Sequence, residues 1–366
     1  MKKICYVVST LKKSGPTNQL YNIINNLPKD IFEPMVITLS SEPEETDIQK
    51  FKDAKIPVIS LGLSRLGGVI KGSRSLLKLV KEYQPDVVHT QGIRSDTLSS
   101  RYLKGYKRVA TLRNYPYEDY PMTYGKFLGQ LMAWQHIKAL KQIDNPVACS
   151  NTIYKLLKKH GLELKVVQNG VDTNKFSSVS EIEKTDLREK LGLPKNKRIF
   201  ISVGHLSARK DPITVIEGFQ KSNFFKNSIL LFLGEGTLID ECRERIKNTT
   251  NIQLLGRKRN VDEYLKSADY FVSASLSEGL PNSVLEALAS GIPVCLSDID
   301  QHQEILDYNQ NAGEIFTTGD SDELGNKLDL LVHGDYERSV NSALEIIREQ
   351  LSAIKMSEKY QKIYNL

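Results

Sequence analysis

The strongest constraint on the fold is a repeated alternation of short apolar runs with longer helix-like segments. The runs are rich in Val, Ile and Leu, and most of them lack a polar residue at every second position. This composition is typical of strands that are buried on both faces of a parallel sheet. Alternation of such strands with helical segments predicts βαβ units with helices on both faces of the sheet. We therefore predict an α/β protein.

The predicted strands fall into two sets, and 366 residues are enough for two full cores. The first set covers residues 4–10, 35–40, 58–63, 86–90, 108–113, 147–150 and 165–168. The second covers residues 199–204, 229–234, 252–255, 270–275, 294–297 and 313–316. We predict two facing Rossmann-like domains with parallel sheets and a deep cleft between them, because ligands of such sheets bind beyond the carboxyl ends of the strands.

The boundary between the domains is placed at a turn signal, Asn169-Gly170, followed by a polar stretch. The prediction is an N-terminal domain over 1–168, a linker over 169–180 and a C-terminal domain over 181–350. The last segment, about 351–366, is helical by its spacing.

Cysteine usage and apolar run lengths indicate the compartment. The four cysteines form no C-x-x-C pair, and three of them lie in apolar strand-like runs, so we expect small buried side chains in a reducing cytosol. The first apolar run is short and no cleavage site follows it, which predicts a strand and no signal peptide. No run approaches about 18 apolar residues, so no transmembrane helix is expected. We therefore expect a cytoplasmic protein.

Charge is distributed unevenly along the chain. Residues 1–175 hold 27 lysines and arginines against 15 aspartates and glutamates, a net charge of +12, whereas the remainder has a net charge of −6. A basic half beside an acidic half indicates an anionic partner for the first half. An anionic membrane surface, an anionic acceptor and nucleic acid are the candidates, but no aromatic–basic recognition motif supports nucleic acid.

Residues 273–298 read as a strand end, a loop, a helix, a Gly stop and a second strand. Glu278 lies in the loop and Glu286 about one turn into the helix, which begins near Asn282 or Ser283, either of which can cap it. A helix N-terminus suits an anion such as a diphosphate, and carboxylates accept hydrogen bonds from sugar hydroxyls. Two glutamates at this spacing are by themselves a weak signal, and a solvated loop and helix surface would explain them. The flanking Gly-Leu-Pro-Asn-Ser and Ala-Leu-Ala-Ser-Gly-Ile-Pro-Val reverse that balance.

The fuller string resembles the signature of retaining glycosyltransferases of family 4, the glycosyl transferases group 1, which have the GT-B fold. Val203-Gly-His-Leu-Ser-Ala-Arg-Lys210 is similar to that family's Gly-Arg-Leu-x-x-x-Lys loop, and Leu233-Gly-Glu-Gly236 to its Gly-x-Gly turn. Asn169-Gly-Val-Asp172, Leu254-Leu-Gly256 and residues 268–275 follow in the family's order. The resemblance is specific over about 165–320 and holds only in outline before that. The resemblance further implies that the domain over 1–168 binds the acceptor and that the domain over 181–350 binds the nucleotide sugar. In the family, the final helix crosses back to complete the first domain, which Tyr360 and Tyr364 would fit.

The resemblance implies roles for residues of the second half. Glu286 would bind the ribose hydroxyls, Glu278 the hydroxyls of the sugar, and Lys210 the diphosphate, where a fixed cation stabilises the leaving group. His205, which replaces a family Arg, would contact the phosphate. Arg209, near Lys210, would compensate for the replaced Arg, although helix geometry would direct it elsewhere. The remaining nucleotide-sugar contacts would come from the turn and the loop, at Gly234, Gly236, Gly279, Leu280, Pro281, Asn282 and Ser283.

Three positions of the first half are candidate site residues. Gly15 lies in the loop after the first strand, which would cover the donor phosphates or the acceptor, unless it is an ordinary βα turn. Thr17 can cap the next helix, and no G-x-G-x-x-G dinucleotide fingerprint is present. His89, near the end of a strand, would face the cleft as a catalytic residue, although a lone His is more often structural. Arg113 would hold phosphate or acceptor charge or merely pair with Glu118. The family often carries His-x-His-Gly where this chain has Gln91, and often a His where this chain has Arg113.

A metal site is not predicted. Asp298-Ile-Asp300 spells the D-x-D of metal-dependent glycosyltransferases, but it aligns with a turn that the family uses without metal, and Glu304 after it would shape the nucleotide pocket. The helix terminus and Lys210 would replace the metal charge. We expect neither a metal nor another cofactor.

The sequence thus predicts a glycosyltransferase that moves a sugar from a nucleotide sugar, a UDP-sugar by preference, to a glycan or lipid-linked glycan acceptor in bacterial surface polysaccharide synthesis. Retention of anomeric configuration follows from the resemblance alone. Two alternatives stay open. A sugar-nucleotide epimerase of similar architecture would need no acceptor, and a non-catalytic subunit would bind nucleotide sugar or glycan without turnover.

A membrane-docking surface is predicted from a basic helix face. Lys71, Arg74, Lys78 and Lys81 are spaced to share one face, after a flexible apolar loop at 66–70. Residues 124–143 are amphipathic, with Phe127, Leu128, Leu131 and Trp134 among the apolar ones. A solvated helix face and a core helix explain each segment alone. Together with the charge of +12, they favour a peripheral enzyme on the inner face of the cell membrane.

Overall fold

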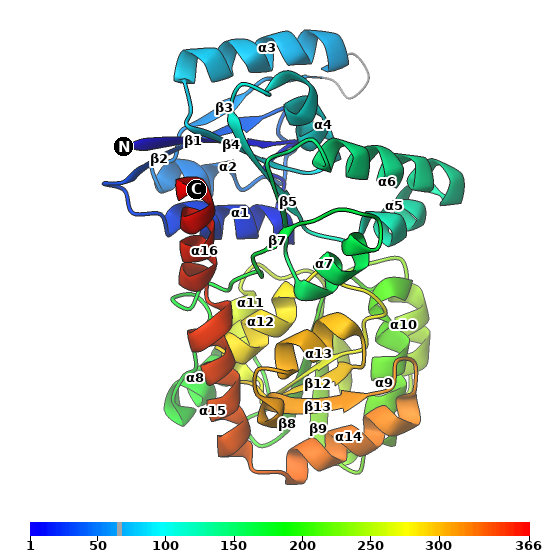
Figure 1. Cartoon of the computed structure of the whole chain (residues 1–366). Coiled ribbons are helices and arrows are strands. Elements are labelled where there is room, and N and C mark those ends of the chain that lie inside the picture. Colours follow the sequence, from blue (N-terminus) through cyan, green and yellow to red (C-terminus); the bar gives the residue numbers. More distant parts are fainter. Residues whose placement is uncertain (64–67) are drawn as a thin grey trace. The chain divides into compact units, whose positions relative to one another are not determined.

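The computed structural model describes residues 1–63 and 68–366, and the side chains of residues 68–72 lie outside this description (Figure 1). The chain forms two compact units. Unit 1 comprises Met1–Asn169 together with Ala353–Leu366, and unit 2 comprises Gly170–Ser352. Within the described residues, no helix combines the length and the apolar composition needed to cross a bilayer. The predicted cleft between the two domains stays a prediction.

Unit 1 contains a seven-stranded parallel sheet in the order β3-β2-β1-β4-β5-β6-β7. Its strands are β1 Lys2–Val8, β2 Phe32–Thr38, β3 Val58–Ser60, β4 Val87–Gln91, β5 Lys107–Leu112, β6 Asn145–Ala148 and β7 Lys165–Val166. Its helices are α1 Gly15–Asn25, α2 Ile48–Asp53, α3 Gly68–Tyr83, α4 Ile93–Tyr102, α5 Pro116–Tyr124, α6 Lys126–Leu140, α7 Asn151–Lys158 and α16 Ala353–Asn365.

Unit 2 contains a six-stranded parallel sheet in the order β10-β9-β8-β11-β12-β13. Its strands are β8 Arg198–Val203, β9 Ser228–Leu233, β10 Ile252–Leu254, β11 Tyr270–Ser273, β12 Val294–Ser297 and β13 Gly313–Phe316. Its α-helices are α8 Glu181–Lys190, α9 Pro212–Lys221, α10 Ile239–Ile246, α11 Val261–Ser267, α12 Asn282–Ala289, α13 Asp300–Leu306, α14 Ser321–His333 and α15 Tyr336–Ile346.

The two sheets share one Rossmann-like topology, which confirms the predicted fold class. In each unit, the third, second, first, fourth, fifth and sixth strands lie side by side in that order, and unit 1 adds a seventh. This order has a switch point between its first and fourth strands, where ligands of such sheets bind beyond the carboxyl ends. In unit 2 the switch point lies between β8 and β11.

Burial on both faces of the sheets explains the missing polar alternation in the strands. Along β1, Ile4 and Tyr6 belong to one buried cluster, whereas Cys5 and Val7 belong to another. In β8, Ile199 and Ile201 face one core and Phe200 the other. All four cysteines are buried free thiols, as expected.

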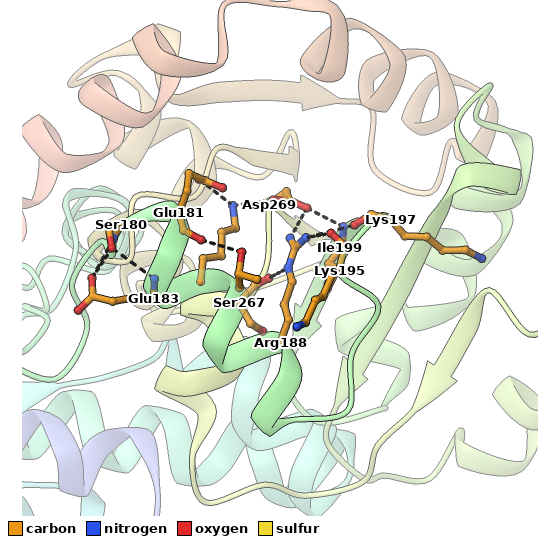
Figure 2. A network of polar contacts seen from close by, with 11 residues as sticks. Ser180, Glu181, Glu183, Arg188, Lys195, Lys197, Ile199, Ser267 and Asp269 are labelled. Atoms are coloured by element: carbon orange, nitrogen blue, oxygen red, sulfur yellow. Dashed lines mark hydrogen bonds and ion pairs between the residues drawn. The ribbon is translucent and has the colours of Figure 1, made fainter.

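The first helix of unit 2 is α8, and a buried network of ion pairs holds it to the sheet (Figure 2). Ser180 and Glu183 form a capping box at its start. Near its end, Arg188 pairs with Asp269 at 2.7 Å and donates to the carbonyl of Ser267 at 2.9 Å. Asp269 also accepts the backbone N–H of Ile199 at 2.8 Å, so one carboxylate joins α8 to β8 just before β11 begins.

The start of α1 differs from the sequence expectation. The capping residue is Ser14 and not Thr17, because the helix begins at Gly15 and the Ser14 hydroxyl accepts the backbone N–H of Thr17 at 3.4 Å. The Thr17 hydroxyl instead donates to the carbonyl of Lys12 at 2.6 Å. Gly15 is thus the first residue of the helix.

Candidate functional site

The candidate site is built on the two loops that follow β8 and β11, at the switch point of the unit 2 sheet. The β8 loop contains a short 3₁₀ helix, η1 Ala208–Lys210, and the β11 loop carries Glu278. A backbone hydrogen bond of 2.8 Å from Leu276 N–H to the carbonyl of Arg209 joins the loops. Lys210 and Glu278, far apart in sequence, are therefore neighbours.

Both cations of η1 reach the Glu278 carboxylate. The Lys210 Nζ bonds Oε1, and the Arg209 Nη1 lies 3.1 Å from Oε2. Arg209 also donates to the carbonyl of Ser277 at 2.6 Å. The expectation that helix geometry would direct Arg209 elsewhere is wrong, because in a 3₁₀ turn the two neighbouring residues both extend to the β11 loop.

The environment of Glu278 favours its ionised form. Burial by itself disfavours the charge, but the adjacent Lys210 and Arg209 outweigh burial and lower the pKa of Glu278 to about 2. Its side chain is only 9% exposed, so the ion pair is shielded from bulk water. Glu278 is therefore an anion throughout the physiological range.

Asp211, which follows η1, helps to orient this loop. Its backbone adopts the left-handed region with φ 45°, a conformation that Asp tolerates better than most residues. Its side chain caps α9, accepting the Thr214 N–H at 3.2 Å and the Thr214 hydroxyl at 2.6 Å. The chain thereby turns sharply after Lys210 and enters α9.

Helix α12 begins directly after the Glu278 loop. It starts at Asn282, as predicted, but its capping position is Pro281, and no side chain caps the first turn. The expectation that Asn282 or Ser283 caps the helix is therefore wrong, because Asn282 and Ser283 are already helical residues. The positive end of the helix dipole consequently lies beside the Glu278 loop. Gly279 and Leu280 belong to this same connection.

Glu286, one turn into α12, lies in a contrasting environment. Burial, aided by the charge of Asp262 and opposed by Lys175, raises the pKa of Glu286 from 4.5 to about 7. The described part of the chain supplies no hydrogen bond to its carboxylate. Two carboxylates of one short segment thus have pKa values that the protein moves in opposite directions, which is frequent at functional sites.

The β9 loop packs against the β8 loop through its two glycines. A Cβ at Gly234 would lie 1.8 Å from the carbonyl oxygen of Gly204, and a Cβ at Gly236 would lie 2.1 Å from that of Leu206. Gly234 and Gly236 therefore serve first as close-packing residues between backbones. The exposed His205 lies beside Gly236, since its Nδ1 would be 2.6 Å from the same Cβ.

Sequence reasoning missed His302 in the α13 segment. Its Nδ1 lies 2.9 Å from the carbonyl of Ser297, so Nδ1 carries the proton and Nε2 is the acceptor. Burial lowers the pKa of His302 to about 4, while the charge of Glu278 opposes that shift. Nε2 is buried and has no partner among the described residues. Only its place between Asp300 and Glu304 could have pointed to it.

The D-x-D string has a local structural use. The Asp298 carboxylate accepts the Thr318 backbone N–H at 2.9 Å and its hydroxyl at 2.5 Å, and these bonds lower the Asp298 pKa. Asp300 is the first residue of α13. Within the described residues, no group of three His, Cys, Asp or Glu side chains could hold a metal ion.

His89 differs from its predicted catalytic placement. The strand continues to Gln91, and the His89 side chain is fully buried inside unit 1. Its Nδ1 lies 2.7 Å from the Tyr364 hydroxyl and its Nε2 lies 2.8 Å from the Thr111 hydroxyl. Burial lowers its pKa to about 3, so His89 is a neutral residue with two buried partners, and this placement contradicts the predicted catalytic role.

The two positions of unit 1 that depart from the family pattern contact each other. Arg113 follows β5, and its Nε donates to the Gln91 Oε1 at 3.4 Å. Its Nη1 donates to the Asn169 Oδ1 at 2.6 Å. Gln91 and Arg113 therefore form one local arrangement at the carboxyl ends of β4 and β5.

Comparison with known proteins places both halves of the chain. The family model described as "Glycosyl transferases group 1" matches residues 183–347, and that described as "Glycosyltransferase Family 4" matches residues 13–175. The chain is 28% identical over 288 residues to the UDP-Gal:alpha-D-GlcNAc-diphosphoundecaprenol alpha-1,3-galactosyltransferase of Escherichia coli, a match that covers 75% of this chain and 73% of the relative.

Two further similarities extend over the full length. The chain is 25% identical to the O-antigen biosynthesis glycosyltransferase WclY of Escherichia coli, covering 99% of this chain and 98% of the relative. The crystal structure of Anabaena Alr3699/HepE in complex with UDP superimposes with a TM-score of 0.85 at 16% identity, covering 100% of both chains. The latter similarity concerns the fold, which is GT-B.

Proposed function

This chain belongs to the group 1 glycosyltransferases of the GT-B fold, and on that premise we propose that it transfers a hexose from a UDP-sugar to a lipid-linked saccharide, with retention of anomeric configuration. The product would be a precursor of a bacterial surface polysaccharide. The observation that carries the proposal is the meeting of Lys210, Glu278 and the start of α12 at the switch point of the unit 2 sheet.

The diphosphate of the donor would lie at Lys210 and the first turn of α12. A helix N-terminus without a side-chain cap offers backbone N–H groups and a positive dipole end to an anion. Lys210 adds a full positive charge at the same edge of the sheet. These groups would stabilise the negative charge that develops on the leaving UDP without a metal ion.

The two glutamates would hold the two sugars of the donor. Glu286 would accept hydrogen bonds from the ribose hydroxyls, and Glu278 would accept them from the transferred sugar. His302 adds a third acceptor, its buried Nε2, on the Glu278 side. In a retaining transfer on one face of the sugar, a phosphate oxygen of the leaving group can take the proton of the attacking hydroxyl, so no protein base is needed.

The choice of donor and acceptor rests on the relatives. The Escherichia coli relative uses UDP-Gal and a diphosphoundecaprenol-linked GlcNAc by its name, and WclY acts in O-antigen biosynthesis by its name. The structurally similar Anabaena protein was crystallised with UDP. These names support a UDP-hexose donor and an acceptor carried on a polyprenyl diphosphate.

An acceptor of that kind is confined to a membrane, and unit 1 has surfaces that suit a bilayer interface. On α3, Arg74, Lys78 and Lys81 are exposed, whereas Lys71 lies outside the described side chains. On α6, Phe127 is 89% exposed and Trp134 is 53% exposed. We therefore propose that the protein works as a peripheral enzyme at the inner face of the cell membrane, with α3 and the α5–α6 pair as its docking elements.

The test is a transfer assay with UDP-Gal, UDP-Glc and UDP-GlcNAc on polyprenyl-diphosphate-linked GlcNAc, preceded by a thermal-shift panel of nucleotide sugars. A bound ligand at about 100 times its dissociation constant adds about 2.7 kcal/mol to stability. Acceptor-dependent release of UDP and an α-linked product support the proposal. Conversion of the nucleotide sugar without acceptor would indicate an epimerase, and binding without turnover would indicate a non-catalytic subunit.

A further inference from the structure

The Glu278 carboxylate forms ion pairs with Lys210 and Arg209, the two cations that would otherwise be available to the donor diphosphate. Its Oε1 accepts from Lys210 and its Oε2 lies 3.1 Å from the Arg209 Nη1. The Lys210 side chain is 18% exposed and the Glu278 side chain 9% exposed, so both charges are largely removed from water. In such surroundings, a charge that loses its partner is strongly destabilised. The site would therefore favour binding of another ion with the same sign as the lost partner.

We propose that Glu278 is an internal counterion for the diphosphate site, and that donor binding exchanges ions there. The incoming diphosphate forms an ion pair with Lys210, which replaces the ion pair between Lys210 and Glu278. The Glu278 carboxylate can then accept hydrogen bonds from the hydroxyls of the transferred sugar. No covalent bond changes in this exchange. The inference rests on the proposed function for the identity of the ligand.

The contacts of the two cations indicate which one moves. Arg209 has a second anchor, its 2.6 Å hydrogen bond to the Ser277 carbonyl, which holds it to the β11 loop. Lys210 has no second hydrogen-bond acceptor in the described part of the chain. Its stem lies over Gly204, where a Cβ would be 3.4 Å from Cε and 3.7 Å from Nζ. The stem is thus supported while the ammonium group can turn from carboxylate to phosphate.

The exchange explains why the site would discriminate a full donor from its nucleotide product. Burial disfavours the Glu278 anion, and the two cations counteract burial. When a diphosphate binds Lys210, the buried Glu278 carboxylate loses one of its two ion-pair partners, which is unfavourable. A UDP-sugar compensates with its sugar hydroxyls, whereas UDP cannot. The geometry therefore favours release of UDP after transfer.

The decisive variant is Glu278→Gln, measured by calorimetric titration with UDP, uridine and inorganic pyrophosphate. Removing the competing carboxylate should tighten UDP and pyrophosphate by at least about tenfold, since coupling energies of close charge pairs are about 1.5 kcal/mol or more. Uridine, which carries no phosphate, should bind as in the wild type. Acceptor-dependent transfer should fall at the same time, because the sugar loses its carboxylate contact.

Three further variants control the interpretation. Glu337→Gln removes an exposed carboxylate of α15, outside the loops of the site, that forms no ion pair within the described residues, and it should shift the UDP affinity less than about twofold. Glu278→Gln combined with Lys210→Gln should lose the gain, because the freed cation is gone. Glu278→Asp keeps the negative charge on a shorter side chain, so the gain in UDP affinity should be smaller. This variant replaces Glu278→Gln as the test if Glu278→Gln proves insoluble.

The outcomes separate the inference from the function on which it rests. Wild type that binds neither UDP nor pyrophosphate overturns both. Wild-type binding of pyrophosphate but not UDP overturns the nucleotide assignment and leaves the exchange measurable. Binding of UDP that is unchanged or weaker in both Glu278→Gln and Glu278→Asp sinks the counterion role, while the glycosyltransferase function would stand.

Discussion

The Nδ1 of His89 lies 2.7 Å from the hydroxyl of Tyr364, although 275 residues separate the two in the sequence. The same hydroxyl lies 3.0 Å from that of Tyr6 on β1. All three side chains are completely buried. Helix α16 therefore closes unit 1 with a polar cluster inside an apolar core, and His89 serves that closure.

Replacing Tyr364 by Phe should destabilise unit 1. The change leaves the Nδ1 of His89 and the hydroxyl of Tyr6 without their buried hydrogen-bond partner, which costs about 1–3 kcal/mol. Urea unfolding measures the loss, and Tyr102→Phe, at a side chain that is 39% exposed, is the matched control with little expected change. A Tyr364→Phe protein as stable as the wild type but without turnover would return His89 to the list of active-site residues.

Lys210→Ala and Glu286→Ala should each reduce turnover at least about 100-fold, the loss typical of one charge-stabilising contact. The fold should survive, because neither side chain belongs to the apolar clusters of unit 2. Steady-state transfer kinetics measure the effect, with Lys226→Ala as a control at an exposed lysine. Near-normal transfer by either soluble variant would refute the site assignment.

Glu286 should make stability fall with rising pH. Its pKa is about 7 in the folded chain against an ordinary 4.5, so the folded state binds more protons between these values. The contribution of Glu286 to the free energy of unfolding is then fully present below pH 4.5 and is lost as the pH rises through 7. Glu286→Gln should equal the wild type near pH 4.5 and exceed it at pH 8 by at most about 3 kcal/mol. Urea unfolding at both pH values measures the difference in free energy of unfolding between the two proteins. A wild type that is more stable than the variant at pH 8 would contradict the prediction.

Transfer should continue in excess chelator. Lys210 and the α12 terminus would provide the charge stabilisation, and Asp298 is engaged with Thr318. Activity measured with and without a chelating agent should agree. Activity that chelation abolishes and magnesium or manganese restores would revive Asp298 and Asp300 as ligands.

Binding to anionic liposomes should require the basic face of α3. A variant with Lys71, Arg74, Lys78 and Lys81 all changed to Gln should lose co-sedimentation, because cations near anionic lipid contribute about 1 kcal/mol each. Binding should weaken as salt rises. A second variant, Phe127→Ser with Trp134→Ser, should lose binding that persists at high salt. A wild type that ignores anionic liposomes at low salt would favour a soluble acceptor.

Local sequence was sufficient for much of the fold. Each of the thirteen predicted strands corresponds to an observed strand, with ends that differ by a few residues. A run such as Val294–Ser297 is buried on both sides of the sheet, so its own composition identifies it. Helix α12 began at the predicted residue because Pro281 and Gly291 limit it locally.

Side-chain partners were not predictable in the same way. Thr17 and Ser14 are both good capping residues, and only the backbone path decides between them. Arg209 was expected to point elsewhere because consecutive helical residues diverge, yet the β11 loop lies near enough to take both cations. His302 has no sequence signature, since its role depends on burial beside Ser297 and Glu278.

The sequence by itself determined the two Rossmann-like sheets and the family signature, and it pointed to Lys210, Glu278 and Glu286 as site candidates, because these features depend on composition and spacing within short segments. Only the tertiary structure decided that Glu278 neutralises Lys210 and Arg209, that the pKa of Glu286 rises while that of Glu278 falls, and that His89 supports α16. Charge and burial at a side chain are set by neighbours from distant segments, and those neighbours are present only after the strands have assembled in their order.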